Sequence, residues 1–292
     1  MTKTILTANL NLYANKTTGM STNDGLSATQ QPGNVGPLPE ARDCIDLVYA
    51  NYDLDNQFTA QVNVAAGTYD KGLAFSGRAR GQKTPGNLKV VGAGYGTTVI
   101  KPTTAGVAGA EINYGGACTL QQLGFDMTSG QDAIITGKRA DFSISFLRFE
   151  HIAAGHNCLT LSEFVSMTCL GNLWIATDCQ CFIQCDQNSS AYWNTNGIPN
   201  QLAIYLEFLA APNRYPLWAS SFLDSGQFCS INIQNIDYHG LKNGVDQGVG
   251  PQFGLGYRIR SRPYSIVDLN TLAVGTLPGT ADFLATQQGI IR

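Results

Sequence analysis

The sequence predicts an all-β solenoid in which short parallel strands are stacked in coils of about 23 residues. Two observations lead to this fold class. Apolar strand patterns recur at a nearly constant interval, and the chain is rich in turn-forming residues, with 32 glycines and only 13% charged residues. This composition, with helical periodicity confined to one segment, is typical of repeated short strands joined by tight turns.

Each period holds two strand signals. The first is a small residue followed by an apolar alternation, and the second is a Leu-x-x-Leu-x-Phe phrase about ten residues further on. The phrase is clearest at 120–125 and 144–149, and a weaker copy spans 167–172. Two strands per period indicate that one repeat is one coil, so equivalent residues stack one coil apart. The first signal begins at Ala110, Ala133, Cys158, Cys181 and Leu202, at intervals of 23, 25, 23 and 21 residues.

The charge balance argues against two classes of partner. The formal net charge is −3 and basic residues do not cluster, so we expect neither nucleic acid nor a membrane surface as a partner. No stretch approaches 18 uncharged apolar residues, so no transmembrane helix is expected. The first twenty residues lack the apolar core of a signal peptide, which predicts a protein made in a reducing compartment with free thiols.

One segment has the pattern of a helix. LPEARDCIDLVYANY at 38–52 contains a proline suited to a helix start and an apolar stripe at helical spacing. We expect one short helix there.

Three of the eight cysteines lie in DCQCFIQCD at 178–186. A zinc site would need a further pair of cysteines or histidines at short spacing, and none follows, so we expect no metal and no cofactor. As a β-strand, the stretch would place Phe182 on the face opposite the cysteines. The repeat makes Cys158 and Cys181 equivalent core residues of adjacent coils. The inward face would comprise Cys179, Cys181, Ile183 and Cys185.

The N-terminal half also resembles a known family. LYANKTTGMSTNDGLSA at 12–28, VNVAAGTYD at 62–70 and LKVVGAGYGTTVI at 88–100 are similar to the first coils of the pectate-lyase-like superfamily, and more narrowly to β-helix spikes and fibres of tailed bacteriophages. The resemblance implies a right-handed parallel β-helix whose open apolar end is capped by an early helix. It covers residues 9–150 best and continues more weakly to about 240.

The expected organisation has three parts. A short peg at 1–8 precedes a β-helix domain at 9–270, which includes the capping helix at 38–52, and a tail follows at 271–292. Phage appendages of this kind are commonly homotrimers, so the resemblance implies a homotrimer.

Catalytic motifs of the superfamily are only partly matched. Enzymatic members have paired aspartates with Gly-His-Gly and Arg-Ile-Lys motifs, whereas this chain has GHN at 155–157 and RIR at 258–260 with no preceding Asp-Asp pair. Two of Asp178, Asp186 and Glu207 could form the carboxylate pair of a glycosidase. Alternatively, the two aspartates flank a strand as turn residues. We favour the turn interpretation and predict no catalytic residue.

The histidines also have an ordinary explanation. His151 follows a predicted strand, and His156 and His239 lie beside glycines at expected coil corners. None has a nearby nucleophile, so we expect no ligand or base among them.

An aromatic insertion is the stronger candidate for a binding site. SSAYWNTNGIPN at 189–200 interrupts the repeat, and insertions in solenoids form loops on one face. Tyr192 and Trp193, with Trp218 in a second irregular run, could stack on a sugar or pack against a neighbouring subunit.

These observations together favour a non-enzymatic structural component of a bacteriophage virion. We expect a short spike or fibre on the neck, collar, head or tail of the particle. Its expected partners are further copies of this chain, other virion proteins at that location, and host surface polysaccharide. The alternative is a phage-borne glycan depolymerase that uses surface carboxylates.

Overall fold

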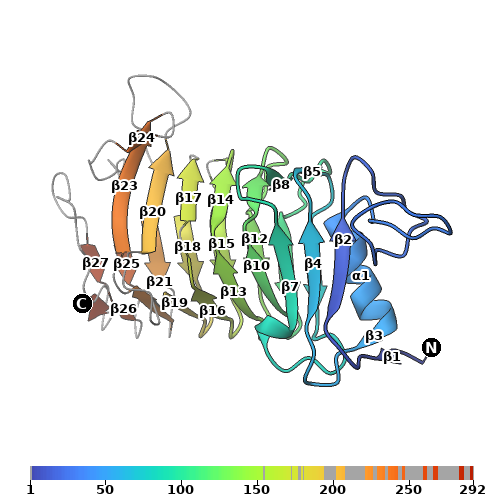
Figure 1. The fold of residues 1–292 in the computed structure, drawn as a ribbon. Coiled ribbons are helices and arrows are strands. Elements are labelled where there is room, and N and C mark those ends of the chain that lie inside the picture. The colour runs from blue at the N-terminus through green and yellow to red at the C-terminus, as the bar shows by residue number, and fades with distance from the viewer. Residues whose placement is uncertain are drawn as a thin grey trace.

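The computed structural model describes residues 2–193, except 154, 172, 177, 178 and 180, and beyond them the strands between residues 202 and 291 together with Cys229. These residues form the predicted right-handed parallel β-helix, in which three parallel sheets run along one solenoid (Figure 1). Each coil contributes one strand to sheet 1, then one to sheet 2, then one to sheet 3.

The strands of the three sheets are short. Sheet 1 contains β2 (Leu10–Ala14), β4 (Ala60–Val64), β7 (Leu88–Gly92), β10 (Ala117–Gln121), β13 (Asp141–Ser145), β16 (Ser166–Cys169), β19 (Ser190–Trp193), β22 (Ser230–Ile233), β26 (Ile266–Asp268) and β28 (Ile290–Ile291). Sheet 2 contains β5 (Gly67–Tyr69), β8 (Thr98–Ile100), β11 (Gly124–Asp126), β14 (Leu147–Glu150), β17 (Leu173–Ala176), β20 (Leu202–Glu207), β23 (Ile236–Lys242) and the antiparallel β24 (Val245–Asp246). Sheet 3 contains β6 (Leu73–Ser76), β9 (Ala110–Asn113), β12 (Ile134–Thr136), β15 (Asn157–Leu161), β18 (Cys181–Cys185), β21 (Ser221–Ser225), β25 (Ile259–Ser261) and β27 (Phe283–Ala285).

The register confirms the repeat and sharpens its length. Along sheet 1, Ala117 pairs with Asp141, Asp141 with Ser166 and Ser166 with Ser190, which are steps of 24, 25 and 24 residues. The next step, from Ser190 to Ser230, is 40 residues, so the expected insertion enters at this coil.

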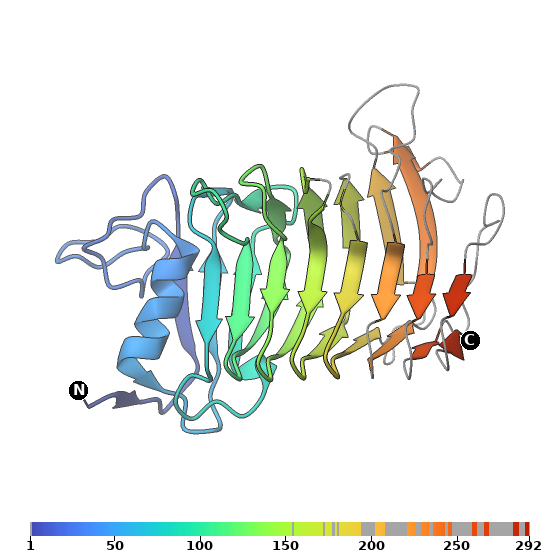
Figure 2. The same cartoon turned by 180° about the vertical axis from the view of Figure 1, so that it is seen from behind.

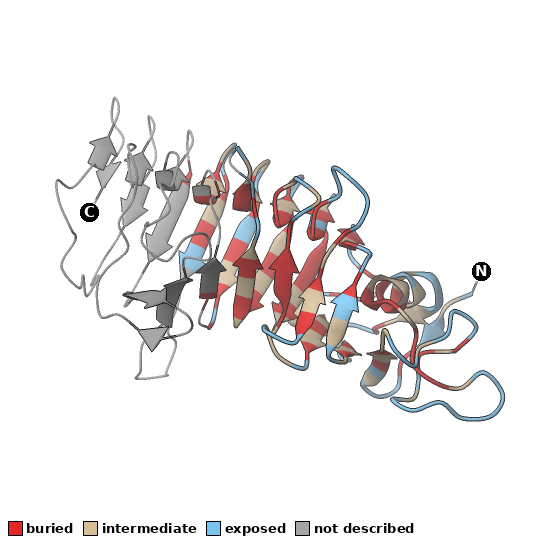
Figure 3. Ribbon diagram, turned by 90° about the horizontal axis from the view of Figure 1, so that it is seen from above, coloured by how far each residue is buried: buried red, intermediate tan, exposed pale blue. Residues whose placement is uncertain are grey.

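Alternation along the strands builds one continuous core (Figure 3). Leu120 pairs with Ile144, and the rings of Phe125 and Phe149 stack with centroids 5.8 Å apart, as the Leu-x-x-Leu-x-Phe phrases predict. The third phrase is wrong. Its Met167 pairs with Phe142, and Cys169 is the partner of Ile144. The turn between β16 and β17 is also longer than the equivalent turn one coil earlier, so the partner of Leu147 is Leu173 and not Leu170.

The predicted register of the small residues is also wrong, by one position. Cys181 pairs with Asn157, so it is not the counterpart of Cys158. Phe182, expected outside, is buried and meets Phe149 edge-on with centroids 6.4 Å apart. The chain turns a corner as it enters sheet 3, so the strict two-residue alternation fails there and the consecutive residues Phe182 and Ile183 are both buried.

The predicted helix is present as α1 (Ala41–Asn51). It begins later than expected, because Leu38 still pairs with Ala14 in extended conformation and donates its N–H to the Tyr13 carbonyl, 2.9 Å away. The buried face of α1 carries Cys44, Ile45 and Val48. Figures 1 and 2 show α1 lying against the N-terminal end of the solenoid, where it covers the first coil.

Both expected terminal segments contribute to the fold. Within the expected peg, β1 (Thr4–Ile5) pairs with β3 (Tyr52–Asp53) and Leu6 is buried. Within the expected tail, β27 pairs with β25 and β28 with β26, so the solenoid continues past residue 270. A 3-10 turn, η1 (Pro85–Asn87), leads into β7. Among the described residues, no helix is long and apolar enough to cross a membrane.

Candidate active site

Two carboxylates lie side by side on the outer face of sheet 2. Asp126 ends β11 and Glu150 ends β14, and the backbone register pairs them directly. Each follows a phenylalanine whose ring is buried in the core. Because successive strand residues alternate between faces, Asp126 and Glu150 lie on the outside of neighbouring coils.

Asp126 is held between two basic side chains. One carboxylate oxygen, Oδ2, lies 2.8 Å from Nζ of Lys101, which follows β8 in the preceding coil. The other, Oδ1, lies 3.0 Å from Nδ1 of His151 in the following coil. Asp126 is thereby fixed across three coils.

A left-handed residue brings the histidine back onto this carboxylate. His151 directly follows β14 and has φ 55, an uncommon conformation for a residue other than glycine. The chain therefore turns sharply after Glu150 and returns the ring to the preceding coil.

Glu150 has a cation of its own. Its Oε1 forms an ion pair with Nη2 of Arg148, two residues earlier on the same face of β14. The side chains of Asp126 and Glu150 are 12% and 18% exposed, whereas those of Lys101 and His151 are 38% and 50% exposed. The acids are thus recessed behind a rim of basic side chains.

The register position of Arg148 continues toward the C-terminus through aromatic residue types. Arg148 pairs with Trp174, Trp174 with Tyr205, and Tyr205 with His239. Successive coils thus carry Arg, Trp, Tyr and His at one register position of sheet 2.

A second Asp–His pair lies at the other end of the same two loops. Asp132 Oδ1 lies 3.2 Å from His156 Nδ1 and accepts the backbone N–H of Asn157 at 2.9 Å, while Oδ2 accepts the hydroxyl of Thr160. Asn157 in turn donates to Gln184 at 2.7 Å, and Gln184 donates to Asp186 at 3.0 Å. Both carboxylate oxygens of Asp132 therefore accept hydrogen bonds from the next coil, which fixes the loop and leaves Asp132 a structural residue.

Two of the three carboxylates suggested by the sequence, Asp186 and Glu207, lie on different sheets. Asp186 lies just after β18 of sheet 3, where its backbone accepts from Ser189 N at 3.2 Å as a turn residue would. Glu207 ends β20 of sheet 2, and its register partner is Leu241. The two therefore belong to different sheets. Asp178 lies outside the described residues.

The structure describes two of the three predicted aromatic residues. Tyr192 lies on β19 within sheet 1, is 36% exposed and pairs with Thr168. Trp193 is the next residue of the strand, and its backbone register partner is Cys169. A glycan or subunit contact at these residues stays a prediction. Trp218 lies outside the described residues.

Cysteine chemistry is not part of the site. Burial raises the pKa of the Cys44 thiol and of the Cys169 thiol to about 12, so neither is a thiolate nucleophile near neutral pH. Cys158 and Cys179 approach each other in the core with 3.6 Å between their sulfurs. In the part of the chain that the structure describes, no group of three His, Cys, Asp or Glu residues could hold a metal ion.

The sequence does contain a signal for the acids. The phrase Leu-x-Phe is followed by an acid in both coils, as Leu123 to Asp126 and Leu147 to Glu150. Extending the repeat by one residue would have found the pair. The role of Lys101 and His151 has no such signal, because both lie in turns of different length.

No family model matches the chain and no curated protein matches it in sequence. Among solved structures, it is similar to a pectin methylesterase variant in complex with a hexasaccharide, with 12% identity over 89% of this chain and 79% of that chain and a TM-score of 0.40. It is also similar to pectin methylesterase PemA from Erwinia chrysanthemi, with 11% identity over 90% of this chain and 80% of that chain and a TM-score of 0.36.

The expected function is corrected on this point. The solved structures found are of pectin methylesterases and not of virion components, so the expectations of a non-enzymatic virion component and of no enzyme activity are not carried further. At such low similarity the likeness assigns no activity to this chain, and an activity has to come from its own residues. The homotrimer, the virion location and the contacts with virion proteins stay predictions.

Proposed function

We propose that the chain is a polysaccharide-cleaving hydrolase in which Asp126 and Glu150 form the catalytic carboxylate pair. The observation that carries this proposal is the direct pairing of the two acids on neighbouring strands of one outer face. No bacteriophage origin is needed for it.

The spacing of the strands suits one class of glycosidase. Neighbouring strands lie about 4.8 Å apart, so paired side chains on one face start from nearly that separation. Retaining glycosidases place their two carboxyl groups about 5–5.5 Å apart, whereas inverting enzymes need about 6.5–9.5 Å to admit a water molecule. The pair of Asp126 and Glu150 therefore favours retention of anomeric configuration.

Each acid pairs with a basic side chain, and the bond between His151 and Asp126, which can carry a proton, assigns the two roles. Glu150, beside the fixed charge of Arg148, attacks the anomeric carbon as the glycosidic C–O bond breaks. Asp126 protonates the departing oxygen, then removes a proton from the water that hydrolyses the glycosyl-enzyme. His151, bonded to Asp126 and half exposed, exchanges protons between that carboxyl group and solvent.

The rim of the site bears on the substrate. Lys101, Arg148 and His151 surround the recessed acids, and all three can donate hydrogen bonds to sugar hydroxyl or carboxylate oxygens. Sugars that carry carboxylate groups gain the additional attraction of the cations. An acidic polysaccharide is the substrate class that this rim fits.

The test is the release of reducing ends from a panel of acidic and neutral polysaccharides. Glu150→Gln should lower the rate of cleavage by about 10²–10⁴-fold, because the isosteric amide cannot attack the anomeric carbon. Glu111→Gln is the matched control, since Glu111 is an exposed carboxylate on sheet 3 in the neighbouring part of the solenoid. Glu111→Gln should cleave like the unaltered chain. Absence of cleavage across the panel, or equal cleavage by both variants, would overturn the proposal.

A further inference from the structure

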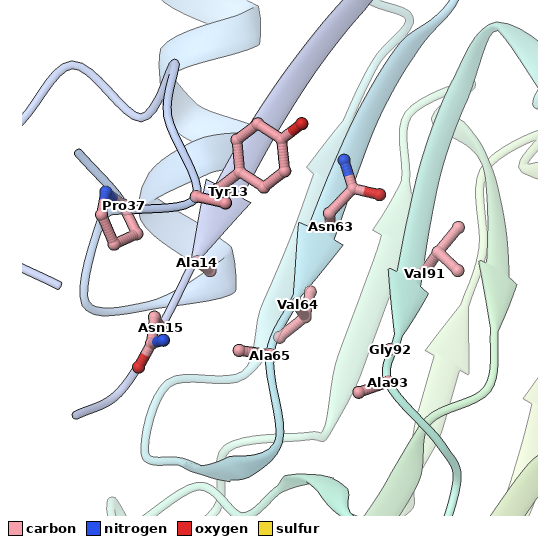
Figure 4. Close-up of a pocket in the computed structure, with 11 residues that line it drawn as sticks. Tyr13, Ala14, Asn15, Pro37, Asn63, Val64, Ala65, Val91, Gly92 and Ala93 are labelled. Carbon is pink, nitrogen blue, oxygen red and sulfur yellow. The ribbon is translucent and has the colours of Figure 1, made fainter. Parts of the chain in front are cut away.

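Sheet 1 carries a cavity at its N-terminal end, on a different sheet from the acids of sheet 2. The cavity has a volume of about 250 Å³ and opens between the carboxyl ends of β2, β4 and β7 and the loop at 15–38 (Figure 4). This is slightly smaller than the roughly 300–1,000 Å³ of sites for drug-sized ligands, so it suits one compact unit.

Backbone hydrogen bonds hold the walls of this cavity. The loop is tied to β2 by Tyr13 N to the Gly25 carbonyl at 2.8 Å and by Asn15 N to the Leu38 carbonyl at 2.8 Å. Across the sheet, Ala65 N donates to the Ala14 carbonyl at 2.9 Å. The cavity is therefore formed before any ligand binds, which lowers the entropic cost of binding.

Its lining combines one aromatic ring with amides and small apolar groups. Tyr13, Asn63 and Val91 occupy one register position on three successive strands, and Figure 4 shows their side chains on the same side of the sheet. Asn63 is oriented, since its Oδ1 accepts from Gln61 at 2.7 Å and its Nδ2 donates to the Leu12 carbonyl at 3.3 Å. Its Nδ2 also donates to Asn11 Oδ1 at 3.5 Å, so the amide is held on both sides. No charged side chain lines the cavity.

The surface that leads away from the cavity carries few charges. The next register position on the outer face of sheet 1 carries amides, hydroxyls and a tyrosine in successive coils, and Lys89 is the one charged residue in this described row. The row runs Asn11, Gln61, Lys89, Thr119, Ser143, Thr168 and Tyr192.

We propose that this face of sheet 1 is a non-catalytic binding site for a neutral glycan, with one sugar unit seated in the cavity against Tyr13. A sugar ring has an apolar face that packs on an aromatic ring and hydroxyl groups that bond to amides and hydroxyls. A phosphate or carboxylate ligand would find no cation in the cavity. The amide and hydroxyl row then meets the following sugar units along the solenoid.

The experiment uses the full chain carrying Glu150→Gln, so that no substrate is cut. Binding of neutral gluco-, galacto- and manno-oligosaccharides is followed by saturation-transfer NMR and by calorimetry. Tyr13→Ala should weaken the binding that the chain shows by at least about tenfold, because it removes the aromatic anchor. Ala93→Trp, at the exposed mouth of the cavity, should block it without changing the core.

Tyr114→Ala is the control, because Tyr114 is a 62% exposed tyrosine away from this face. Its affinity should match that of the parent. Two results would overturn the proposal: no binding of any neutral oligosaccharide, or binding that survives both Tyr13→Ala and Ala93→Trp. The catalytic proposal is tested separately, by cleavage of short acidic substrates with a chain that carries only Tyr13→Ala and keeps Asp126 and Glu150. The failure of glycan binding at the cavity is therefore distinguishable from the failure of catalysis.

Discussion

The two Asp–His pairs that join the coil of β10–β12 to the coil of β13–β15 differ clearly, although they flank the same loops. Asp126 and His151 stand where sheet 2 ends, and Asp132 and His156 stand near the start of sheet 3. Asp132 accepts from a backbone N–H and a hydroxyl of the next coil, so its oxygens serve the loop. Asp126 instead meets two exposed basic side chains and has Glu150 as its register partner.

This contrast shows that an Asp–His pair has no fixed meaning in a solenoid. The same two side chains clamp a loop when backbone donors fill the carboxylate, and present a reactive group when a second acid lies beside it. The neighbours one coil away decide which role applies. The predictions below separate the two roles, beginning with the largest effect.

The sharpest test compares the same change at both aspartates. Asp126→Asn should reduce polysaccharide cleavage by about 10²–10⁴-fold, because an amide cannot deliver the proton to the leaving oxygen. Its folding free energy should change by about 1 kcal/mol or less, since the lost ion pairs are with exposed partners. Rate and urea-unfolding measurements check both. If Asp132→Asn lost as much activity without unfolding, the two pairs would not differ as we propose.

The second prediction concerns the stability of the loop clamp. Asp132→Ala should lower the free energy of unfolding by about 2–3 kcal/mol, because it leaves the buried N–H of Asn157 and the hydroxyl of Thr160 without their acceptor. Asp46→Ala is the control, since the pair of Asp46 with Arg42 on α1 is exposed and worth only about 0.3–0.5 kcal/mol. Equal losses in both variants would show that Asp132 is no clamp.

The sequence was sufficient for the architecture of the N-terminal coils. Coils stack only when apolar residues recur at equivalent positions, so the repeat can be recognised in the sequence. The pairs Leu120 with Ile144 and Phe125 with Phe149 are examples. The register failed where turn length varies or the backbone turns a corner, at Met167 and at Cys181. A turn can gain residues without changing the core, so interval counting cannot fix the register beyond it.

The candidate site was less predictable, for a related reason. Asp126 and Glu150 each follow a core phenylalanine, so the repeat carries them, but Lys101 and His151 reach the site from turns. The left-handed conformation of His151 has no reliable sequence signal, since most residues that adopt it are glycine or asparagine. Asp186 and Glu207 were candidates for a pair because the repeat placed them in successive coils, whereas the fold puts them on different sheets.

The smallest predicted effect is a pH dependence of stability that comes from a buried thiol of the core. It should be the same in Asp126→Asn and in Asp132→Asn. Burial raises the pKa of the Cys169 thiol from 9.0 to about 12, so between these values the unfolded chain loses its proton while the folded chain keeps it. The folded state then binds more protons, and stability falls as pH rises through this window. Raising the pH from 9 to 10 should cost about 1 kcal/mol through this thiol, and Cys169→Ala should remove that part of the slope. Urea unfolding at the two pH values, with Asp126→Asn and Asp132→Asn measured alongside, checks this. If Cys169→Ala left the pH dependence of the unfolding free energy unchanged, other groups would cause the loss of stability at alkaline pH. If this pH dependence differed between Asp126→Asn and Asp132→Asn, one of the surface Asp–His pairs would be coupled to the buried thiol.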